Sequence, residues 1–359
     1  MLRFRDKAIA AKVLKKIRDL GVKARFMNIC GTHQDTIVRY SLDTLLEPYG
    51  IELIAGPGCP ICVTTAREYR EAMILATRGK IVATYGDAAR VRIRGRSLLS
   101  LRGEGADVRI VYSIDDAVDI AVKNPDKDVV FLAVGFETTA PATAYTILSD
   151  PPKNFYILSC HRRIPPAIEA LLSLGEIRID GFIDPGHVST IIGIEPYERI
   201  VSSFPIPHVI SGFEPLDVLV SVYMLARQIK MGEAKVENEY SRAVRREGNP
   251  KALKLIEEVF ETVDLEWRGL SRVDNSGMHL RKKYEDREAR LVFQDEIDLH
   301  GDYSEPKGCL CSEVLRGLVK PRGCPLFSNV CTPLNPIGPC MVSVEGACYI
   351  EYKHRRGLA

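Results

Sequence analysis

Eight short apolar segments alternate with helical patterns through the first two-thirds of the chain, and this alternation limits the fold more than any other feature. The segments are rich in β-branched and aromatic residues. They lie at residues 25–29, 51–55, 80–85, 108–112, 128–134, 154–159, 179–183 and 207–211. Strands that alternate with helices are typical of parallel sheets covered by helices. We therefore predict an α/β protein.

The eight predicted strands divide into two sets of four, with a boundary near Tyr112. We therefore expect two similar parallel-sheet α/β domains, at residues 22–112 and 113–230. From Gly308 onward, glycine, proline and cysteine dominate and the periodicity disappears. This predicts a third, smaller, loop- and helix-rich domain at residues 231–359, which we expect the N-terminal helix 1–21 to join.

Three segments outside the predicted strands have a recognisable pattern. Residues 216–233 and 250–269 have the periodicity of amphipathic helices. The charged segment 281–290 is typical of a solvated face.

Charge and hydropathy exclude several classes of protein. The chain has 49 basic and 47 acidic residues and a net charge of +2. It therefore lacks the excess positive charge that is typical of proteins that bind nucleic acid or an anionic membrane. Residues 4–20 mix charged with apolar side chains and so lack the apolar core of a signal peptide. No segment reaches the ~18 consecutive apolar residues that a membrane span needs. We therefore expect a cytoplasmic protein that binds neither nucleic acid nor membrane.

Ten cysteines are unevenly distributed along this chain, and the cytoplasm keeps ordinary structural disulfides reduced. Six of them lie within forty residues near the C-terminus: Cys309, Cys311, Cys324, Cys331, Cys340 and Cys348. An iron–sulfur cluster, which tolerates irregular spacing, fits them better than zinc, which usually takes cysteines in closely spaced pairs. Buried inert thiols are the third alternative. Spacing alone cannot select four ligands from six.

Cys59 and Cys62 form a Cys-Pro-Ile-Cys sequence between a predicted strand and a helical pattern. A cysteine near a helix N-terminus is favoured as thiolate, and a pair at this spacing can open and close as a disulfide. The alternative is half of a zinc site, but no second pair of suitable spacing is nearby in the sequence. We therefore favour redox chemistry.

Polar or glycine-containing loops follow seven of the predicted strands, and in open α/β sheets such loops meet around a ligand. Cys30, with His33 three residues later, is a candidate nucleophile or soft-metal ligand. Cys160 is interpreted as packing. His187 either faces the cleft or hydrogen-bonds loop backbone, and we favour the cleft. Two carboxylates are expected at equivalent points of adjacent strand ends, where they are candidates for acid/base groups or for helix caps: Glu137 and Glu214.

Six motifs in this order resemble the HypD family of hydrogenase maturation proteins. They read CGTHQ, GPGCPICV, GFETTAP, PGHVS, SGFEP and CPLFSNVCTPLNPIGPCMVSVEGAC. The resemblance extends from about Phe4 to Tyr352. One departure is Gln34, where the family usually has glutamate, so a possible charge beside Cys30 is missing.

The resemblance implies two similar α/β domains and a third that carries a [4Fe–4S] cluster. The family's spacing of fourteen, six and sixteen residues between ligands selects Cys309, Cys324, Cys331 and Cys348. The remaining Cys311 and Cys340 match a pair that forms a disulfide beside the cluster. Cys59 and Cys62 then resemble the outer dithiol of a thiol relay, similar in logic to ferredoxin-dependent thioredoxin reductase.

The resemblance also implies a function. The family assembles the Fe(CN)2CO group of [NiFe]-hydrogenases together with a small HypC-type chaperone, and a HypE-type protein supplies the cyanide. Cys30 matches the cysteine expected to bind that iron, and thiolate is a soft donor that suits it. His33 and His187 would line the same cleft and tune or protonate ligands. The alternatives are a stand-alone cluster-dependent thiol–disulfide reductase and a zinc-stapled binding module.

Overall fold

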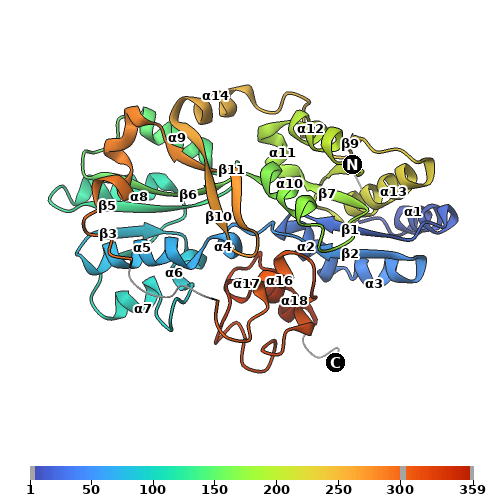
Figure 1. Cartoon of the computed structure of the whole chain (residues 1–359), viewed down its shortest axis with the longest axis horizontal. Coiled ribbons are helices and arrows are strands. Elements are labelled where there is room, and N and C mark those ends of the chain that lie inside the picture. The colour runs from blue at the N-terminus through green and yellow to red at the C-terminus, as the bar shows by residue number, and fades with distance from the viewer. Residues whose placement is uncertain (1–4, 300–304, 356–359) are drawn as a thin grey trace.

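The structure, a computed structural model, describes residues 5–299 and 305–355 and has an α/β fold with two sheets (Figure 1). Sheet A is parallel throughout, with strand order β2-β1-β7-β8-β9. Its strands are β1 (Ala24–Asn28), β2 (Ile51–Ala55), β7 (Gly181–Pro185), β8 (His208–Ser211) and β9 (Val236–Asn238).

Sheet B is mixed, with strand order β10-β11-β6-β5-β3-β4. Strands β3 to β6 are parallel, whereas β11 runs antiparallel to both β6 and β10. Its strands are β3 (Ile81–Thr84), β4 (Val108–Ile110), β5 (Val129–Gly135), β6 (Phe155–Arg162), β10 (Phe260–Trp267) and β11 (Ser271–Leu280).

Helices connect the strands, and most are short. The first half of the chain forms α1 (Lys7–Leu20), α2 (Gly31–Arg39), α3 (Leu42–Leu46), α4 (Pro60–Val63), α5 (Ala66–Thr77), α6 (Gly86–Arg90), α7 (Leu98–Gly103), α8 (Ile114–Lys123) and α9 (Ala140–Leu148). The second half forms α10 (Ile164–Leu174), α11 (Gly186–Ile192), α12 (Glu195–Ser203), α13 (Pro215–Met231), α14 (Pro250–Val259), α15 (Ala289–Val292), α16 (Cys311–Leu315), α17 (Pro339–Val342) and α18 (Ala347–Arg355). Three 3-10 turns complete the set: η1 (Glu47–Tyr49), η2 (Lys282–Arg287) and η3 (Pro321–Gly323).

The expected division of the strands at Tyr112 is wrong. Strands β1 and β2 pair with β7, β8 and β9, whereas β3 and β4 pair with β5 and β6. Each sheet therefore contains strands from both sides of the boundary, and the ranges 22–112 and 113–230 do not correspond to the two sheets. The apolar periodicity identifies strands, but it carries no information about which strands pair.

The N-terminal helix does not join the cysteine-rich segment as expected. Helix α1 packs along α13 at the outer end of sheet A (Figure 1). Its buried Ile17 belongs to the hydrophobic cluster that also contains Phe26 and Val222. The amphipathic face of α1 therefore covers sheet A.

The helix expected over 250–269 ends at Val259, and the chain continues as strand β10. The sequence carries a signal for this change, because apolar side chains alternate at Val263, Leu265 and Trp267. The hairpin of β10 and β11 extends sheet B beside β6. Its turn points toward the centre of the molecule (Figure 1).

The charged segment 281–290 is only partly a solvated face. Lys282 and Asp286 in η2 are exposed, but Glu288 is 3% exposed and forms a parallel bridge with Ile157 of β6. Arg290 donates through Nε to the buried Glu71 carboxylate at 2.7 Å. The expectation is therefore wrong for the last residues of the segment, where Glu288 is buried and Arg290 pairs with Glu71 and Glu68 of α5.

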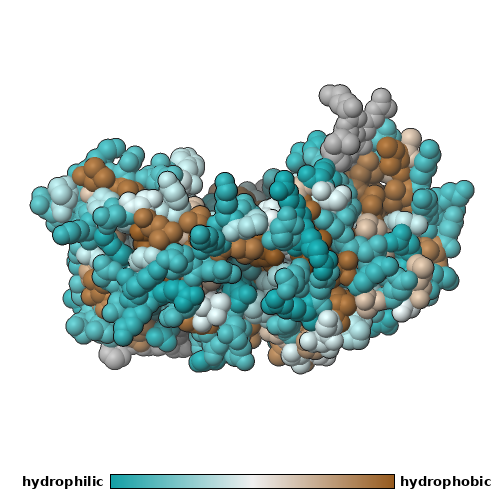
Figure 2. All heavy atoms as spheres, turned by 90° about the horizontal axis from the view of Figure 1, so that it is seen from above, coloured by the Kyte–Doolittle hydropathy of each residue, from teal (hydrophilic) through white to brown (hydrophobic). Residues whose placement is uncertain are grey.

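The cysteine-rich segment, residues 305–355, lies under the junction of the two sheets (Figure 1). Its buried Val314, Met341 and Cys348 belong to the same hydrophobic cluster as Met27 of sheet A and Leu132 of sheet B. The segment thus shares its core with the rest of the protein. No helix in the described ranges is long and apolar enough to cross a membrane. Hydrophilic side chains cover most of the face shown in Figure 2, with hydrophobic residues in separate patches.

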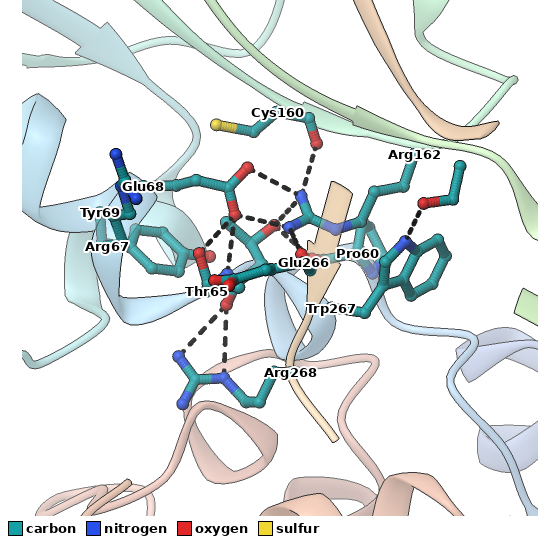
Figure 3. Close-up of polar contacts among 12 residues, drawn as sticks. Pro60, Thr65, Arg67, Glu68, Tyr69, Cys160, Arg162, Glu266, Trp267 and Arg268 are labelled. Atoms are coloured by element: carbon teal, nitrogen blue, oxygen red, sulfur yellow. Dashed lines mark hydrogen bonds and ion pairs between the residues drawn. The ribbon is translucent and has the colours of Figure 1, made fainter. Parts of the chain in front are cut away.

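A buried ion pair joins α5 to the end of β6. Arg162 is fully buried and donates to both carboxylate oxygens of Glu68, at 3.1 and 2.5 Å (Figure 3). Burial alone would raise the pKa of Glu68, but the charges of Arg162 and Arg290 outweigh it and lower that pKa to about 2. Glu68 also accepts from the backbone and hydroxyl of Thr65, which begins α5.

We predict that Glu68→Gln destabilises the protein by about 3–5 kcal/mol, because it leaves the Arg162 guanidinium buried without its counter-charge. The matched control is Glu104→Gln. Glu104 pairs with Arg96 on the surface, where both side chains are about half exposed, and the expected loss is below about 1 kcal/mol. Urea unfolding followed by circular dichroism measures both. Equal shifts for the two variants would contradict the importance of the buried pair.

Candidate functional site

Cys30 lies at the carboxyl end of sheet A, between β1 and α2, and its side chain is 3% exposed. The loop that follows β2 presses directly against it. The Gly31 amide donates to the Gly58 carbonyl at 3.2 Å, and a Cβ on Gly58 would lie 2.2 Å from the Cys30 nitrogen. Only glycine therefore fits at position 58, and this close approach places the Cys59 loop beside Cys30.

Cys59 and Cys62 are joined by a disulfide in the structure. Cys59 caps α4, and its sulfur accepts from the Cys62 amide at 3.2 Å. On the other side, the Cys62 sulfur lies 3.9 Å from the carbonyl of Pro339, the residue before Cys340. Helix α4 thus lies between the Cys30 loop and the cysteine-rich segment.

The six cysteines of the cysteine-rich segment line one small cavity of about 10 Å³. The sulfur atoms of Cys311 and Cys340 are 2.6 Å apart. A Cβ on Gly338 would lie 2.6 Å from the Cys309 sulfur, so the segment closes tightly over the thiols. In the described ranges no group of three or more His, Cys, Asp or Glu side chains has the arrangement of an ion site. The donors are of the soft type that an iron–sulfur cluster takes, but the thiols must separate to hold one.

The thiols of this cavity influence one another. The thiols of Cys309 and Cys340 donate to Cys311, and together with the charge of Arg268 they lower the pKa of Cys311 well below its usual value. The same contact with Cys311, with burial, raises the pKa of Cys340. The thiolate form is therefore favoured at Cys311 over Cys309 and Cys340, because these two thiols donate their hydrogen to Cys311.

Two histidines flank Phe213 next to Cys30. His33 and His187 both stack on the Phe213 ring, with ring centroids 4.9 and 5.1 Å from it. The Nε2 atom of His33 donates to the carbonyls of Ser211 and Gly212 at 3.2 and 2.9 Å. Its Nδ1 atom is buried and has no hydrogen-bond partner in the described part of the chain.

His187 faces Cys30, with its Nδ1 atom 4.0 Å from the sulfur. Burial raises the pKa of the Cys30 thiol to about 12 and lowers the pKa of His187 to about 4. Burial and the nearby His187 also lower the pKa of His33 to about 4. At neutral pH the site therefore holds a neutral thiol beside two neutral imidazoles, and a thiolate at Cys30 needs a cation to stabilise it.

The two candidate carboxylates have different positions. Glu214 caps α13 and pairs with Arg5 at 2.7 Å, which confirms the interpretation as a helix cap. Glu137 follows β5 of sheet B, so the two do not lie on adjacent strands as expected. One Glu137 oxygen accepts from the Ile164 amide at the start of α10 at 2.9 Å, and the other has no partner among the described residues. Glu137 lines a cavity of about 570 Å³ between α10, α14 and β10.

Gln34 and Cys160 lie apart from the thiol site. The Gln34 amide oxygen accepts from Asn28 at 2.9 Å, and the side chain lines a separate cavity beside the edge strand β2. Cys160 is fully buried in sheet B, where Arg290 donates to its sulfur at 3.5 Å. Its packing agrees with the interpretation given from the sequence.

Several residues next to the thiols were not predicted from the sequence. Glu345 lies against α2, where a Cβ on Gly31 would be 2.5 Å from the Glu345 Cβ, and its charge raises the pKa of Cys30 further. Arg268 and Phe213 approach from the β10–β11 turn and from the end of β8. Gly58 belongs to the GPGCPICV motif, but its close approach to Cys30 depends on the pairing of β1 with β2, which the sequence pattern does not indicate.

The fold and the site define an α/β protein in which cysteines lie in contact order from Cys30 through the Cys59–Cys62 disulfide to the six cysteines of the C-terminal segment. A family model described as HypD, Hydrogenase formation hypA family, matches residues 7–355. The chain therefore belongs to the HypD family.

Curated relatives agree with this assignment. The chain is 48% identical to a putative hydrogenase expression/formation protein of Methanocaldococcus jannaschii, over 99% of this chain and 100% of the relative. It is 44% identical to the hydrogenase maturation factor HypD of Cupriavidus necator, over 98% of this chain and 96% of the relative. It is 45% identical, with the same coverage, to the hydrogenase maturation factor HypD2 of Bradyrhizobium diazoefficiens.

We predict a pH-dependent effect of Glu137→Gln. Burial raises the pKa of Glu137 to about 7, whereas an unfolded glutamate titrates near ~4.3. As the pH rises from ~4.3 to about 7, the unfolded chain releases the Glu137 proton before the folded protein does, so the free energy of unfolding falls. Glutamine does not ionise, so the variant lacks this loss of stability. The variant should gain up to about 3 kcal/mol relative to the wild type between pH 4.5 and pH 8. Urea unfolding at several pH values measures this gain, and a constant difference would contradict the buried carboxylate.

Proposed function

We propose that this chain is a hydrogenase maturation factor that serves as scaffold and electron source for assembly of the Fe(CN)2CO group of [NiFe]-hydrogenase. A HypC-type small chaperone and a HypE-type cyanide donor would be its partners. The observation that carries the proposal is the order of the thiols. Cys30 contacts the Cys59 loop through Gly58, and Cys62 contacts the Cys340 segment through Pro339. We propose the cytoplasm as its location, since thiols stay reduced there.

Four cysteines would hold a [4Fe–4S] cluster: Cys309, Cys324, Cys331 and Cys348. They converge on one cavity and offer the thiolate sulfur that such clusters take. When bound, the cluster would supply single electrons. Cys311 and Cys340 are not needed as ligands in this assignment, and their sulfur atoms are 2.6 Å apart, so this pair can form a disulfide. In its reduced form, the Cys311–Cys340 pair would pass two electrons at a time to the Cys59–Cys62 disulfide by thiol–disulfide exchange.

Cys30 would bind the iron that is the cargo of this reaction, with a cysteine of the chaperone as the second thiolate. The buried Cys30 thiol keeps its proton up to a pKa of about 12, so iron must replace that proton. His187 is the nearest acceptor, with Nδ1 at 4.0 Å. Phe213 stacks on His187 and would hold it at this position, and His33 stacks on Phe213 in turn.

A stand-alone thiol–disulfide reductase is the second candidate, because the Cys59–Cys62 disulfide is present in the structure. Such a reductase has no use for Cys30, which belongs to neither disulfide pair. A variant that lacks Cys30 therefore distinguishes the scaffold from the reductase.

We predict that Cys30→Ala folds, keeps the cluster and keeps the redox response of Cys59 and Cys62. It should lose the infrared bands of iron-bound cyanide and carbonyl and fail to support hydrogenase maturation in cells. Cys160→Ala is the matched control, because it removes another fully buried strand-end thiol outside this site. Wild-type maturation by Cys30→Ala would exclude the scaffold role of Cys30 and favour the reductase.

A second prediction tests the choice of ligands. Cys324→Ala should lose the brown visible absorption and bound iron, and the cysteine-rich segment should become sensitive to protease, since metal binding contributes to the folding of a loop-rich segment. Cys311→Ala should retain the iron. Iron analysis and limited proteolysis of the two anaerobically purified variants decide the question, and the ligand assignment is wrong if Cys311→Ala loses iron while Cys324→Ala keeps it.

A further inference from the structure

The turn between β10 and β11, residues 268–270, packs against the end of helix α4, which carries the Cys59–Cys62 disulfide. The backbone amide of Arg268 donates to the Val63 carbonyl at 2.8 Å. Its guanidinium donates through Nε and Nη2 to the Thr64 carbonyl at 3.3 and 3.2 Å (Figure 3). One residue, Arg268, therefore makes three hydrogen bonds to the two residues that follow Cys62.

The same turn packs on the start of α16, which carries Cys311. Gly269 has a φ of +87°, and a Cβ there would lie 3.1 Å from the carbonyl oxygen and 3.3 Å from the Cα of Ser312. The side chain of Arg268 is 3% exposed, and its Nη1 atom pairs with Glu305 just before the cysteine-rich cavity. The turn therefore contacts Val63 and Thr64, which follow Cys62 directly. It also contacts Ser312, which follows Cys311.

Contacts of Trp267 and Arg162, both in strands of sheet B, hold the turn in place. Trp267 is buried, donates through its indole nitrogen to Ser276 at 2.8 Å, and lies under the Arg162 guanidinium (Figure 3). Arg162 also donates to the Thr64 hydroxyl at 3.4 Å. Thr64 is thus held by two buried arginines, with Arg162 at its side chain and Arg268 at its carbonyl.

We propose that Arg268 is a positioning residue that fixes the Cys59–Cys62 pair against the Cys311–Cys340 pair for thiol–disulfide exchange. The proposal rests on the proposed function, because that function requires exchange between these pairs. Arg268 holds the end of α4 through the carbonyls of Val63 and Thr64, and the next residue, Gly269, packs on Ser312 at the start of α16.

The exchange that Arg268 would support is balanced within the chain. A thiolate of Cys311 or Cys340 attacks the Cys59–Cys62 bond, which breaks as a mixed disulfide forms. The second thiolate of the Cys311–Cys340 pair then attacks the sulfur of its own partner in the mixed disulfide. This step releases the cysteine of the Cys59–Cys62 pair that was held in the mixed disulfide. Cys311 and Cys340 lose two electrons and two protons and become a disulfide, while Cys59 and Cys62 gain both and become two thiols. No other oxidant or reductant takes part in the exchange.

The test follows the disulfide in the full chain. The protein, with Cys59–Cys62 oxidised and the other thiols reduced, is incubated anaerobically, quenched with acid at set times, alkylated and mapped by mass spectrometry. We expect Arg268→Ala to slow the transfer of the disulfide about 10- to 100-fold, because a displacement of about 1 Å between reacting groups has effects of this size. Arg268→Lys, which keeps one donor for the Thr64 carbonyl, should have an intermediate rate.

Arg272→Ala is the matched control, since Arg272 lies in the same hairpin, is exposed and pairs only at the surface with Asp264. All rates are measured well below the melting temperature of each variant, so that a loss of stability alone does not change them. An Arg268→Ala rate within about two-fold of the wild type overturns the positioning role and leaves the proposed function intact. If the wild type itself shows no transfer, both the positioning role and the thiol relay of the proposed function are wrong.

Discussion

The close contact between Gly58 and Cys30 is the constraint on which the site depends. A side chain at position 58 would collide with the Cys30 backbone, since its Cβ would lie 2.2 Å from the nitrogen. This contact places a strand-end thiol and a Cys-x-x-Cys pair side by side without any bond between them. It exists because β1 and β2 are adjacent and parallel in sheet A, so that their carboxyl ends and the following loops meet.

Sheet B holds the other side of the disulfide helix. The chain leaves sheet A after β2, forms α4 and α5, and enters sheet B at β3. At this crossing the Arg162–Glu68 pair fixes the start of α5, and the β10–β11 turn fixes the end of α4. The disulfide thus lies on a segment that is anchored to both sheets. Gly58, just before the disulfide, contacts the Cys30 backbone, and the Cys62 sulfur contacts Pro339 of the cysteine-rich segment.

The sequence predicts the α/β class and most strands, because apolar periodicity is a local property. It also indicates the cysteines as candidate site residues, because their spacing can be read directly. It does not predict that β3 and β4 leave the first sheet, because strand pairing is decided by packing between distant residues. In segment 250–269 the helical periodicity of the first half hides the strand of the second half, where Val263, Leu265 and Trp267 alternate. Arg268 and Glu345 reach the thiols only through tertiary contacts, so no motif around them indicates their positions.

We propose that Cys30 and the cysteine-rich segment serve one reaction, in which iron is assembled at Cys30 with electrons from the segment. This is tested by the infrared spectrum and iron content of the chain purified anaerobically with a HypC-type chaperone. We expect bands of iron-bound cyanide and carbonyl, together with more iron than a single [4Fe–4S] cluster contains. Iron for the cluster alone, with no such bands, would exclude assembly of iron at Cys30.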